Sequence, residues 1–243
     1  MNRKVNIKRY KRQDQVSYTL GATLTIELLK KRSDIIQKIY IHSKMDSEKI
    51  LEKVEEICNR EKIAIEYNDK AFRILSDKEN CFVIGEFRKF DCELDNSKKH
   101  IVLVSPSNSG NLGTIMRTAV GFGVKELAII RPAVDIYDPK TIRASMGAIF
   151  NLNFRYFNSF EEYRDYARER EYFPFMLKGS LPLPKIRFPE PCSLIFGNEA
   201  TGLSDEFLKI GQSVIIDHSL EIDSLNLPIA VSIALYEATK HLK

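Results

Sequence analysis

Residues 101–119 read IVLVSPSNSGNLGTIMRTA, and this stretch decides the fold class. It opens with five residues, 101–105, that are apolar enough for a buried strand. A loop of Ser, Asn and Gly follows, and apolar residues at helical spacing then continue through 116–122. A buried strand, a glycine-containing loop and a helix in this order are typical of one unit of a parallel α/β sheet.

The alternation of strands and helices continues toward the C-terminus. We expect strands at 126–130, 173–177, 193–196 and 213–216, and helices at 161–170 and 228–242. Asp138 followed by Pro139 resembles a helix N-cap with proline in the first helical position, which predicts a helix running toward Phe150. Such a pattern indicates a mainly parallel sheet with helices on both faces.

The segment 91–100, DCELDNSKKH, is polar and aperiodic and is the candidate linker. Before it we expect helices at 22–31, 46–60 and 70–75, and strands at 38–42, 63–67 and 81–87. The sequence therefore predicts two domains, a small α/β domain over 1–95 and a larger one over 100–243.

Positive charge is concentrated in the smaller domain. Residues 1–99 hold 22 Lys and Arg against 17 Asp and Glu, whereas residues 100–243 hold 15 against 16. The first twelve residues carry six basic side chains and no acid. Such an arm suits a polyanion, because bound phosphates release counterions; the alternative is a solvated chain start.

Composition excludes several classes of protein. Hydrophobic residues make up 44% and charged residues 29%, as in a soluble globular protein. We find no apolar run long enough for a membrane span and no secretory signal, so we expect a cytoplasmic protein. The four cysteines form no C-x-x-C pair, so neither a disulfide scaffold nor a zinc site is expected.

Ligands of parallel sheets bind beyond the carboxyl ends of the strands, which directs attention to three loops. The first, 107–113, contains Gly110 and Gly113 but matches neither the dinucleotide nor the P-loop fingerprint. Asn111 and Arg117 follow at a spacing that lets both face one cleft. The alternative is that Asn111 is a turn residue and Arg117 a surface charge.

The other two loops also carry isolated polar residues. Glu199 lies between two glycines in 196–204, FGNEATGLS, just after an apolar strand. Ser224 and Asn226 precede the last helix in 222–237. The alternatives are a capped turn at Glu199 and an ordinary helix cap at Ser224.

Together, the three loops resemble the signature motifs of the SpoU-like (TrmH-type) branch of the SPOUT methyltransferases. The motifs correspond to 108–119, 196–204 and 223–237, and 139–150 is similar to a stretch that the family places between the first two. The front domain, with YTLG at 18–21, more loosely resembles a ribosomal-protein-like RNA-binding domain, although NCF stands at 80–82 where many members have His-Gln-Gly.

The resemblance implies an α/β fold whose C-terminal segment forms a trefoil knot, and a homodimer with the active site completed across the interface. It implies S-adenosylmethionine as cofactor, no metal, and RNA rather than DNA as partner. The stripe 229–236 would contribute to the dimer interface. Gly197, Ile216 and Leu225 would line the cofactor pocket, and the polar site would comprise Asn111, Arg117, Glu199, Ser224 and Asn226.

The implied reaction is methylation of a ribose 2′-hydroxyl. An arginine is always protonated, so Arg117 is better suited to position a phosphate and stabilise the developing oxyanion than to act as a base. Another group or a substrate phosphate would accept the proton. Asn111 and Glu199 would orient Arg117, while Ser224 and Asn226 would shape the cofactor and ribose sites.

The chain departs from the family pattern before the third motif. Asp217 and His218 stand where Pro-Met is common, and Leu220 where glycine is common. Ile216 is the predicted pocket residue that this departure affects most.

Ribosomal RNA is the favoured substrate and transfer RNA the alternative. A non-catalytic RNA-binding protein of the same fold would be expected to have lost motif residues, and all five predicted polar residues are present. A nucleotide-dependent oxidoreductase lacks its glycine fingerprint here.

Overall fold

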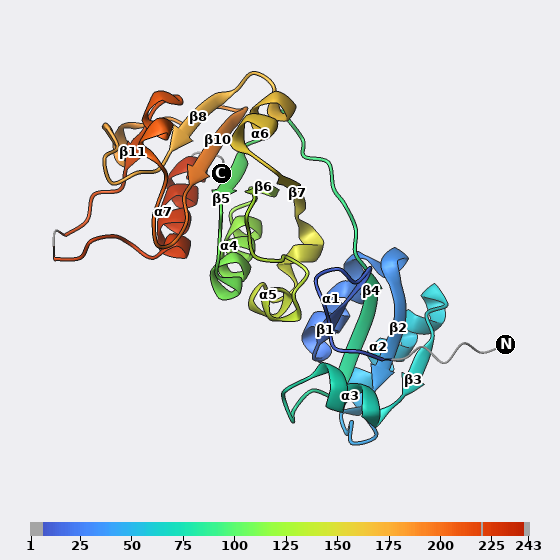
Figure 1. The fold of residues 1–243 in the computed structure, drawn as a ribbon. Coiled ribbons are helices and arrows are strands. Elements are labelled where there is room, and N and C mark those ends of the chain that lie inside the picture. The colour runs from blue at the N-terminus through green and yellow to red at the C-terminus, as the bar shows by residue number, and fades with distance from the viewer. Residues whose placement is uncertain (1–6, 220, 241–243) are drawn as a thin grey trace. The chain divides into compact units, whose positions relative to one another are not determined.

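The computed structural model describes residues 7–219 and 221–240 and separates the chain into two compact units (Figure 1). The N-terminal unit comprises the chain up to Phe90 together with Asp135–Phe150. The C-terminal unit comprises Asp91–Val134 and the chain from Asn151 onward.

The N-terminal unit is a four-stranded sheet covered by helices. Its strand order is β1 (Val16–Leu20), β4 (Val83–Arg88), β2 (Ile36–Ile41) and β3 (Ile65–Tyr67), and only the β2–β3 pair is parallel. The helices are α1 (Ala22–Lys31), α2 (Glu48–Glu61) and α3 (Asp69–Leu75). This is the small α/β unit that the sequence predicts, with β1 as a strand that sequence patterns did not reveal.

The alternating direction of the side chains along β2 explains why helices cover both faces of this sheet. Ile39 and Ile41 pack with Val54 and other apolar residues of α1 and α2, whereas Tyr40 packs with Phe72 of α3. Successive side chains of a strand point to opposite faces, so the apolar run 39–41 of β2 is buried on both.

Residues 135–150 group with the N-terminal unit, although the sequence assigns them to the larger domain. The Ser17 hydroxyl donates a 2.5 Å hydrogen bond to the carbonyl of Tyr137, and the rings of Phe87 and Phe150 meet edge to face. The helix here, α5 (Pro139–Ala144), begins at the predicted Asp138 cap, whose side chain accepts from Lys140 N.

The sequence predicted that this helix runs toward Phe150, but α5 ends at Ala144. Met146 and Gly147 take left-handed φ angles of 51° and 85°, which end helical hydrogen bonding. A short 3-10 helix, η2 (Ala148–Asn151), follows instead.

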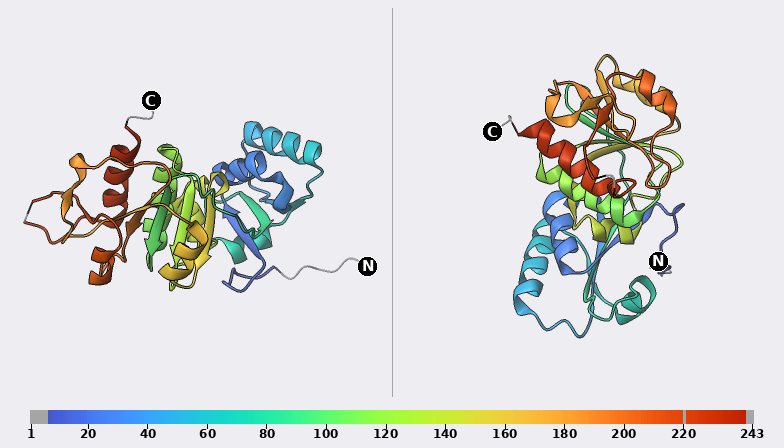
Figure 2. Two further views of the ribbon diagram at one scale, coloured as in Figure 1. Left: turned by 90° about the horizontal axis from the view of Figure 1, so that it is seen from above. Right: turned by 90° about the vertical axis from the view of Figure 1, so that its left-hand side faces the viewer.

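The C-terminal unit contains a five-stranded sheet in which every pair is parallel. The order is β7 (Asn153–Phe157), β6 (Glu126–Ile130), β5 (His100–Val104), β10 (Cys192–Phe196) and β8 (Glu171–Pro174). Helices α4 (Ser109–Gly121) and α7 (Leu227–Thr239) lie side by side (Figure 2). The predicted α/β class with a mainly parallel sheet is confirmed, while the knot stays a prediction.

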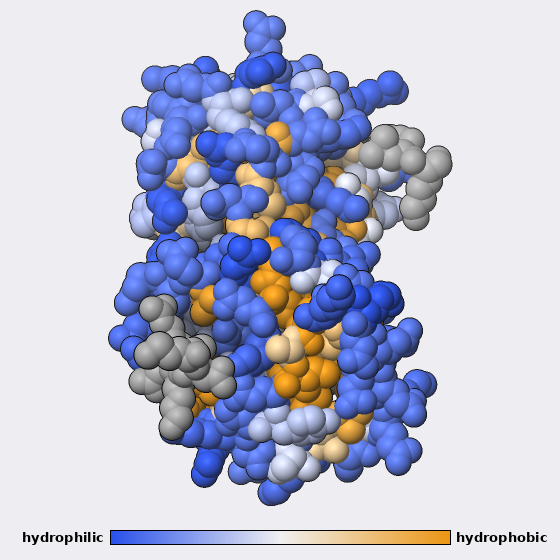
Figure 3. Space-filling view, turned by 90° about the vertical axis from the view of Figure 1, so that its right-hand side faces the viewer, coloured by the Kyte–Doolittle hydropathy of each residue, from blue (hydrophilic) through white to orange (hydrophobic). Residues whose placement is uncertain are grey.

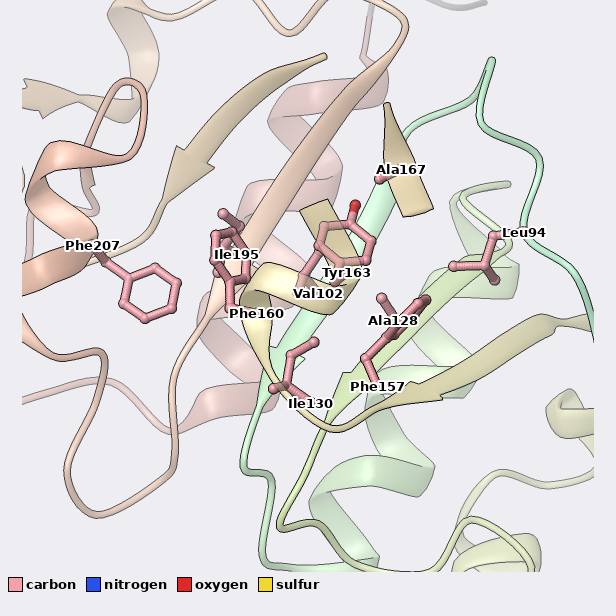
Figure 4. Packing of buried hydrophobic residues seen from close by; sticks show 10 residues of the cluster. All are labelled: Leu94, Val102, Ala128, Ile130, Phe157, Phe160, Tyr163, Ala167, Ile195 and Phe207. Atoms are coloured by element: carbon pink, nitrogen blue, oxygen red, sulfur yellow. The ribbon is translucent and has the colours of Figure 1, made fainter. Parts of the chain in front are cut away.

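Helix α6 (Phe160–Ala167) packs on the sheet through an aromatic cluster (Figure 4). Phe160 and Tyr163 of this helix contact apolar side chains of β5, β6 and β10, among them Val102 and Ile195. Phe157, at the end of β7, meets the Tyr163 ring edge to face at 5.3 Å. Burial of these large side chains fixes the sheet whose strand ends carry the loops described below.

One predicted strand is not part of the main sheet. Residues predicted as 213–216 form the shorter β11 (Val214–Ile215), which pairs in parallel with β9 (Leu181–Pro182) in a separate two-stranded sheet. Two residues per strand give too little periodicity for sequence patterns to distinguish the sheets. Two further short 3-10 helices, η3 (Leu183–Lys185) and η4 (Asp205–Lys209), flank this region.

The predicted linker packs against the C-terminal unit. The hydroxyl of Tyr166 receives a 2.8 Å hydrogen bond from Leu94 N, and the carboxylate of Glu126 receives one of 2.9 Å from Asp95 N. The unit therefore begins at Asp91, nine residues before the predicted start of the larger domain at 100.

Hydrophilic residues predominate on the face shown in Figure 3. Among the described residues, no helix is long and apolar enough to cross a membrane.

Arg3 and Lys4 of the basic arm lie outside the described residues, and so does Leu220. Arg9 is described and pairs with Asp77 at 3.2 Å on the surface of the N-terminal unit.

Candidate active site

A cavity of about 350 Å³ opens in the C-terminal unit near the carboxyl ends of β8 and β10. Four segments line it, within 175–178, 196–205, 214–218 and 224–230. Three of these segments follow or contain strands, so the topology of the sheet brings together residues far apart in sequence.

A tight turn after β10 forms one wall of the cavity. Gly197 is buried, and a Cβ at this position would lie 2.1 Å from the carbonyl carbon of Gly202, so only glycine fits. Asn198 Nδ2 donates to the carbonyl of Ser105 at 2.7 Å, and Asn198 Oδ1 accepts from Ala200 N at 2.8 Å. The turn is thereby attached to the loop that follows β5.

Glu199 connects the same two loops through its carboxylate. One oxygen accepts from the backbone N–H and the hydroxyl of Ser107 at 3.0 and 2.8 Å. The other accepts from Asn108 N at 3.1 Å and from Asn111 Nδ2 at 3.2 Å. Partial burial acts to raise the pKa of Glu199, but hydrogen bonds led by that from Ser107 N outweigh it and hold the pKa below its ordinary value.

A helix cap within the first loop positions that loop for its contact with Glu199. The side chain of Asn108 accepts from Asn111 N at 3.0 Å and so begins α4. Capping fixes the first turn of α4, which places the Asn111 side chain beside Glu199. The predicted pair Asn111 and Glu199 is therefore in direct contact.

The third segment contributes Ile216 to the lining, and the fourth contributes Ser224 and Leu225. Ser224 is not the cap of α7, because the helix N-cap is Asn226, with Pro228 in the first turn. The carbonyl of Asn226 accepts from Ile229 N at 2.9 Å and from Ala230 N at 3.0 Å.

Five of the eight residues predicted for the site line the cavity: Gly197, Glu199, Ile216, Ser224 and Leu225. Asn111 lies one hydrogen bond behind the wall, through Glu199. Asn226 and Arg117 are exposed and outside the lining.

Arg117 does not share the position of Asn111, although their spacing predicts a common cleft. Six residues correspond to about 240° of rotation around an α-helix, and Arg117 shares its exposed face with Gly110 and Thr114. In the part of the chain that the structure describes, Arg117 makes no hydrogen bond or ion pair. Its guanidinium is available to a ligand.

Sequence reasoning assigned no role to several residues that hold the site together. Ser107 and Asn108 donate to Glu199, and Asn198 attaches the β10 turn to Ser105. Their signal was present, since small polar residues cluster in both loops, but the pairing across about 90 residues is visible only in three dimensions.

The lining combines apolar walls with a few polar groups, a combination and size that suit a small organic ligand. Phe175 and Phe196 stack with ring centroids 4.5 Å apart, and Lys178 pairs with Asp205 at 3.0 Å. Within the described ranges, no group of three or more His, Cys, Asp or Glu residues could hold a metal ion. The donor set fits an organic cofactor with both apolar and polar parts.

Residues 98–236 match the SpoU rRNA Methylase family, and the chain belongs to that family. A 23S rRNA (uridine(2479)-2′-O)-methyltransferase of Streptomyces viridochromogenes is 33% identical over 143 residues. The alignment covers 56% of this chain and 50% of that relative, so the chain spans about half of the relative's length.

Solved structures extend the likeness to both units. An AdoMet-bound rRNA methyltransferase from Sinorhizobium meliloti superimposes with a TM-score of 0.80 at 26% identity, covering 94% of this chain and 88% of that one. A structure described as giving insights into 2-OH methylation of C/U34 on tRNA has a TM-score of 0.57 at 33% identity and covers 61% of this chain and 98% of that one.

Proposed function

We propose that this protein transfers a methyl group from S-adenosylmethionine to a ribose 2′-hydroxyl of RNA. The observation that carries the proposal is the cavity itself: two of the three motif segments line it, and the first motif is joined to its wall through the hydrogen bonds of Glu199. Relatives named as 2′-O-methyltransferases and the cofactor-bound structure support the same chemistry.

The cofactor would be held by Gly197, Ile216 and Leu225, mainly through backbone groups, with Ser224 beside them. When bound, S-adenosylmethionine supplies an electrophilic methyl group on a sulfonium centre. Because Gly197 has no side chain and is buried, the backbone of the β10 turn can form a wall that a larger residue would disrupt.

Glu199 and Asn111 act as positioning residues in this proposal. The four hydrogen bonds of the Glu199 carboxylate go to the β5 loop and the start of α4. They keep the wall of the cavity in register with the helix that bears Arg117. Holding reactants in line is the contribution that such a scaffold makes to the rate.

Arg117 is proposed to bind an RNA phosphate and to stabilise the oxyanion that develops on the attacked ribose. Its guanidinium is exposed and has no partner among the described residues, as a phosphate-binding group requires before substrate arrives. It remains protonated and so cannot accept the 2′-hydroxyl proton. The proposed acceptor of this proton is a nearby group or the substrate phosphate.

A homodimer is proposed from one face of α7. Ile229, Ile233 and Tyr236 are 51%, 37% and 60% exposed, whereas Leu235 on the same helix is fully buried. Exposed apolar side chains that cluster on one helix face indicate a contact surface. We expect Ile229→Glu to convert a dimer to a monomer in sedimentation velocity, and Glu206→Gln, at an exposed position outside α7, to leave it unchanged; a monomeric parent would contradict the dimer.

Ribosomal RNA is the proposed substrate class and the cytoplasm the proposed location. The excess of Lys and Arg over Asp and Glu in residues 1–99, 22 against 17, supports contact with a large RNA.

Transfer of a labelled methyl group from S-adenosylmethionine to unmodified ribosomal and transfer RNA tests the function, with nuclease mapping of the label to the ribose. Label on 2′-oxygens of ribosomal RNA is expected. Label on transfer RNA alone would change the substrate class. Absence of both label and cofactor binding would favour a non-catalytic RNA-binding protein instead.

A further inference from the structure

His218 lies in the cavity lining and has one ring nitrogen already engaged. Its Nδ1 lies 2.8 Å from the carbonyl oxygen of Ile216. A carbonyl oxygen only accepts, so Nδ1 must carry the proton in this contact. In the neutral imidazole, Nε2 is then a hydrogen-bond acceptor, and within the described residues it has no partner.

We propose that His218 recognises the cofactor through this acceptor, and that its charge state lets the pocket distinguish the sulfonium cofactor from its neutral product. The inference rests on the proposed function, since it places S-adenosylmethionine in this cavity. The cofactor offers N–H and O–H donors, which a neutral Nε2 can accept from.

One pair of opposite charges and several carboxylates surround the cavity. Lys178 and Asp205 pair with each other across the segments that follow β8 and β10. The carboxylate of Glu199 is occupied by donors of the β5 loop. Asp217, Glu221 and Asp223 lie in the His218 segment and are exposed, hence well screened.

Protonation of His218 would therefore have two effects on a bound ligand. It would convert the Nε2 acceptor into a donor, which removes the proposed hydrogen bond for any ligand with the same donor. It would also place a positive charge in the cavity, which opposes a sulfonium but not a thioether. S-adenosylmethionine should thus lose more affinity on acidification than S-adenosylhomocysteine does.

The test is the dissociation constant of each ligand, measured by isothermal titration calorimetry at about pH 8 and about pH 5.5, across the range in which histidine changes charge. The parent chain is compared with His218→Gln, which keeps an acceptor but does not titrate, and with His218→Leu, which has neither property. Binding is measured without RNA, so the readout is independent of activity.

For the parent we expect S-adenosylmethionine to bind at least about fivefold more weakly at the lower pH, with a smaller loss for S-adenosylhomocysteine. His218→Gln should bind as the parent does at the higher pH and lose this difference between the ligands. His218→Leu should bind both ligands about fivefold more weakly at the higher pH.

Two results would overturn the inference while leaving the proposed function intact. One is a His218→Gln protein that keeps the parent's full pH dependence for both ligands. The other is a His218→Leu protein that binds as tightly as the parent at the higher pH. A parent that binds neither ligand at either pH would instead overturn the proposed cofactor, and with it this inference.

Discussion

The side-chain amide of Asn111 donates a 3.2 Å hydrogen bond to the carboxylate of Glu199, which lies 88 residues later in the chain. Both residues are only partly buried, and the contact joins the start of α4 to the turn after β10. The carboxylate accepts three more hydrogen bonds from Ser107 and Asn108. It is thus the centre of the contact between two family motifs.

Glu199→Gln should weaken the hydrogen bonds made at this position while preserving the shape of the side chain. A glutamine offers one acceptor oxygen and turns its NH₂ group toward N–H donors, so at least one donor loses its partner. We expect a loss of about 1–3 kcal/mol in the free energy of unfolding, measured by urea denaturation, and weaker cofactor binding.

A double-mutant cycle of Glu199→Gln with Asn111→Ala measures their coupling. Because the two side chains touch, we expect the combined loss to fall short of the sum of the single losses by about 0.5–1.5 kcal/mol. Glu206→Gln is the matched control, since that glutamate is exposed and outside the contact. Strict additivity would contradict the expected coupling between these two side chains.

Arg117→Ala should abolish methyl transfer and leave cofactor binding largely unchanged. The side chain is exposed and outside the cavity lining, so its removal disturbs neither the core nor the pocket. Arg187→Ala removes another exposed arginine of the same unit and should retain activity. Rates are compared under single-turnover conditions with saturating cofactor. An active Arg117→Ala protein would refute the proposed role.

The sequence predicted the parallel sheet of the C-terminal unit because its strands and the helix after β5 carry strong patterns. Glu126–Ile130 was predicted with both ends correct, and it is buried at every position. The strand β7, NFRYF, was missed, since its alternation is interrupted by Arg155 and Tyr156, which are only partly buried.

The site was predictable in its residues but not in its connections. Motif spacing selected Gly197, Glu199, Ser224 and Leu225, which do line one cavity. It could not show that Asn111 and Arg117 lie on different faces of α4, because loop geometry determines where the helix begins. The sequence marked His218 only as a departure from the family pattern, and its proposed role follows from its contact with the carbonyl of Ile216.

Deletion of residues 1–12 should weaken RNA binding and reduce its dependence on salt. The segment carries six Lys and Arg and no acid, and each lost phosphate contact lowers the slope of log K against log salt by about 0.7–0.9. Filter binding to a ribosomal RNA fragment at several salt concentrations measures the slope. If the deletion weakened RNA binding by the same factor at every salt concentration, electrostatic contact between the arm and RNA would be excluded.

From the environment of His100 we predict how the stability of the C-terminal unit depends on pH. The residue is fully buried at the start of β5. Its Nε2 lies 3.0 Å from the carbonyl of Asp95 and must donate to it, so the neutral ring accepts at Nδ1 from the hydroxyl of Tyr163 at 2.9 Å. Burial, and next the charge of Arg170, lower the pKa of His100 from 6.5 to about 4.

Because the pKa of His100 is lower in the folded protein than in the unfolded chain, acid should lower the stability of the C-terminal unit. In the unfolded chain this histidine takes up a proton near pH 6.5, whereas in the folded protein it stays neutral down to about pH 4. The stabilisation is therefore complete above about pH 6.5 and is lost as the pH falls toward 4, by up to about 3 kcal/mol. Urea denaturation between these pH values, followed by circular dichroism, measures it. His100→Gln should flatten this profile, while His42→Gln, in the N-terminal unit, should retain it; an unchanged profile in His100→Gln would assign the acid sensitivity to other groups.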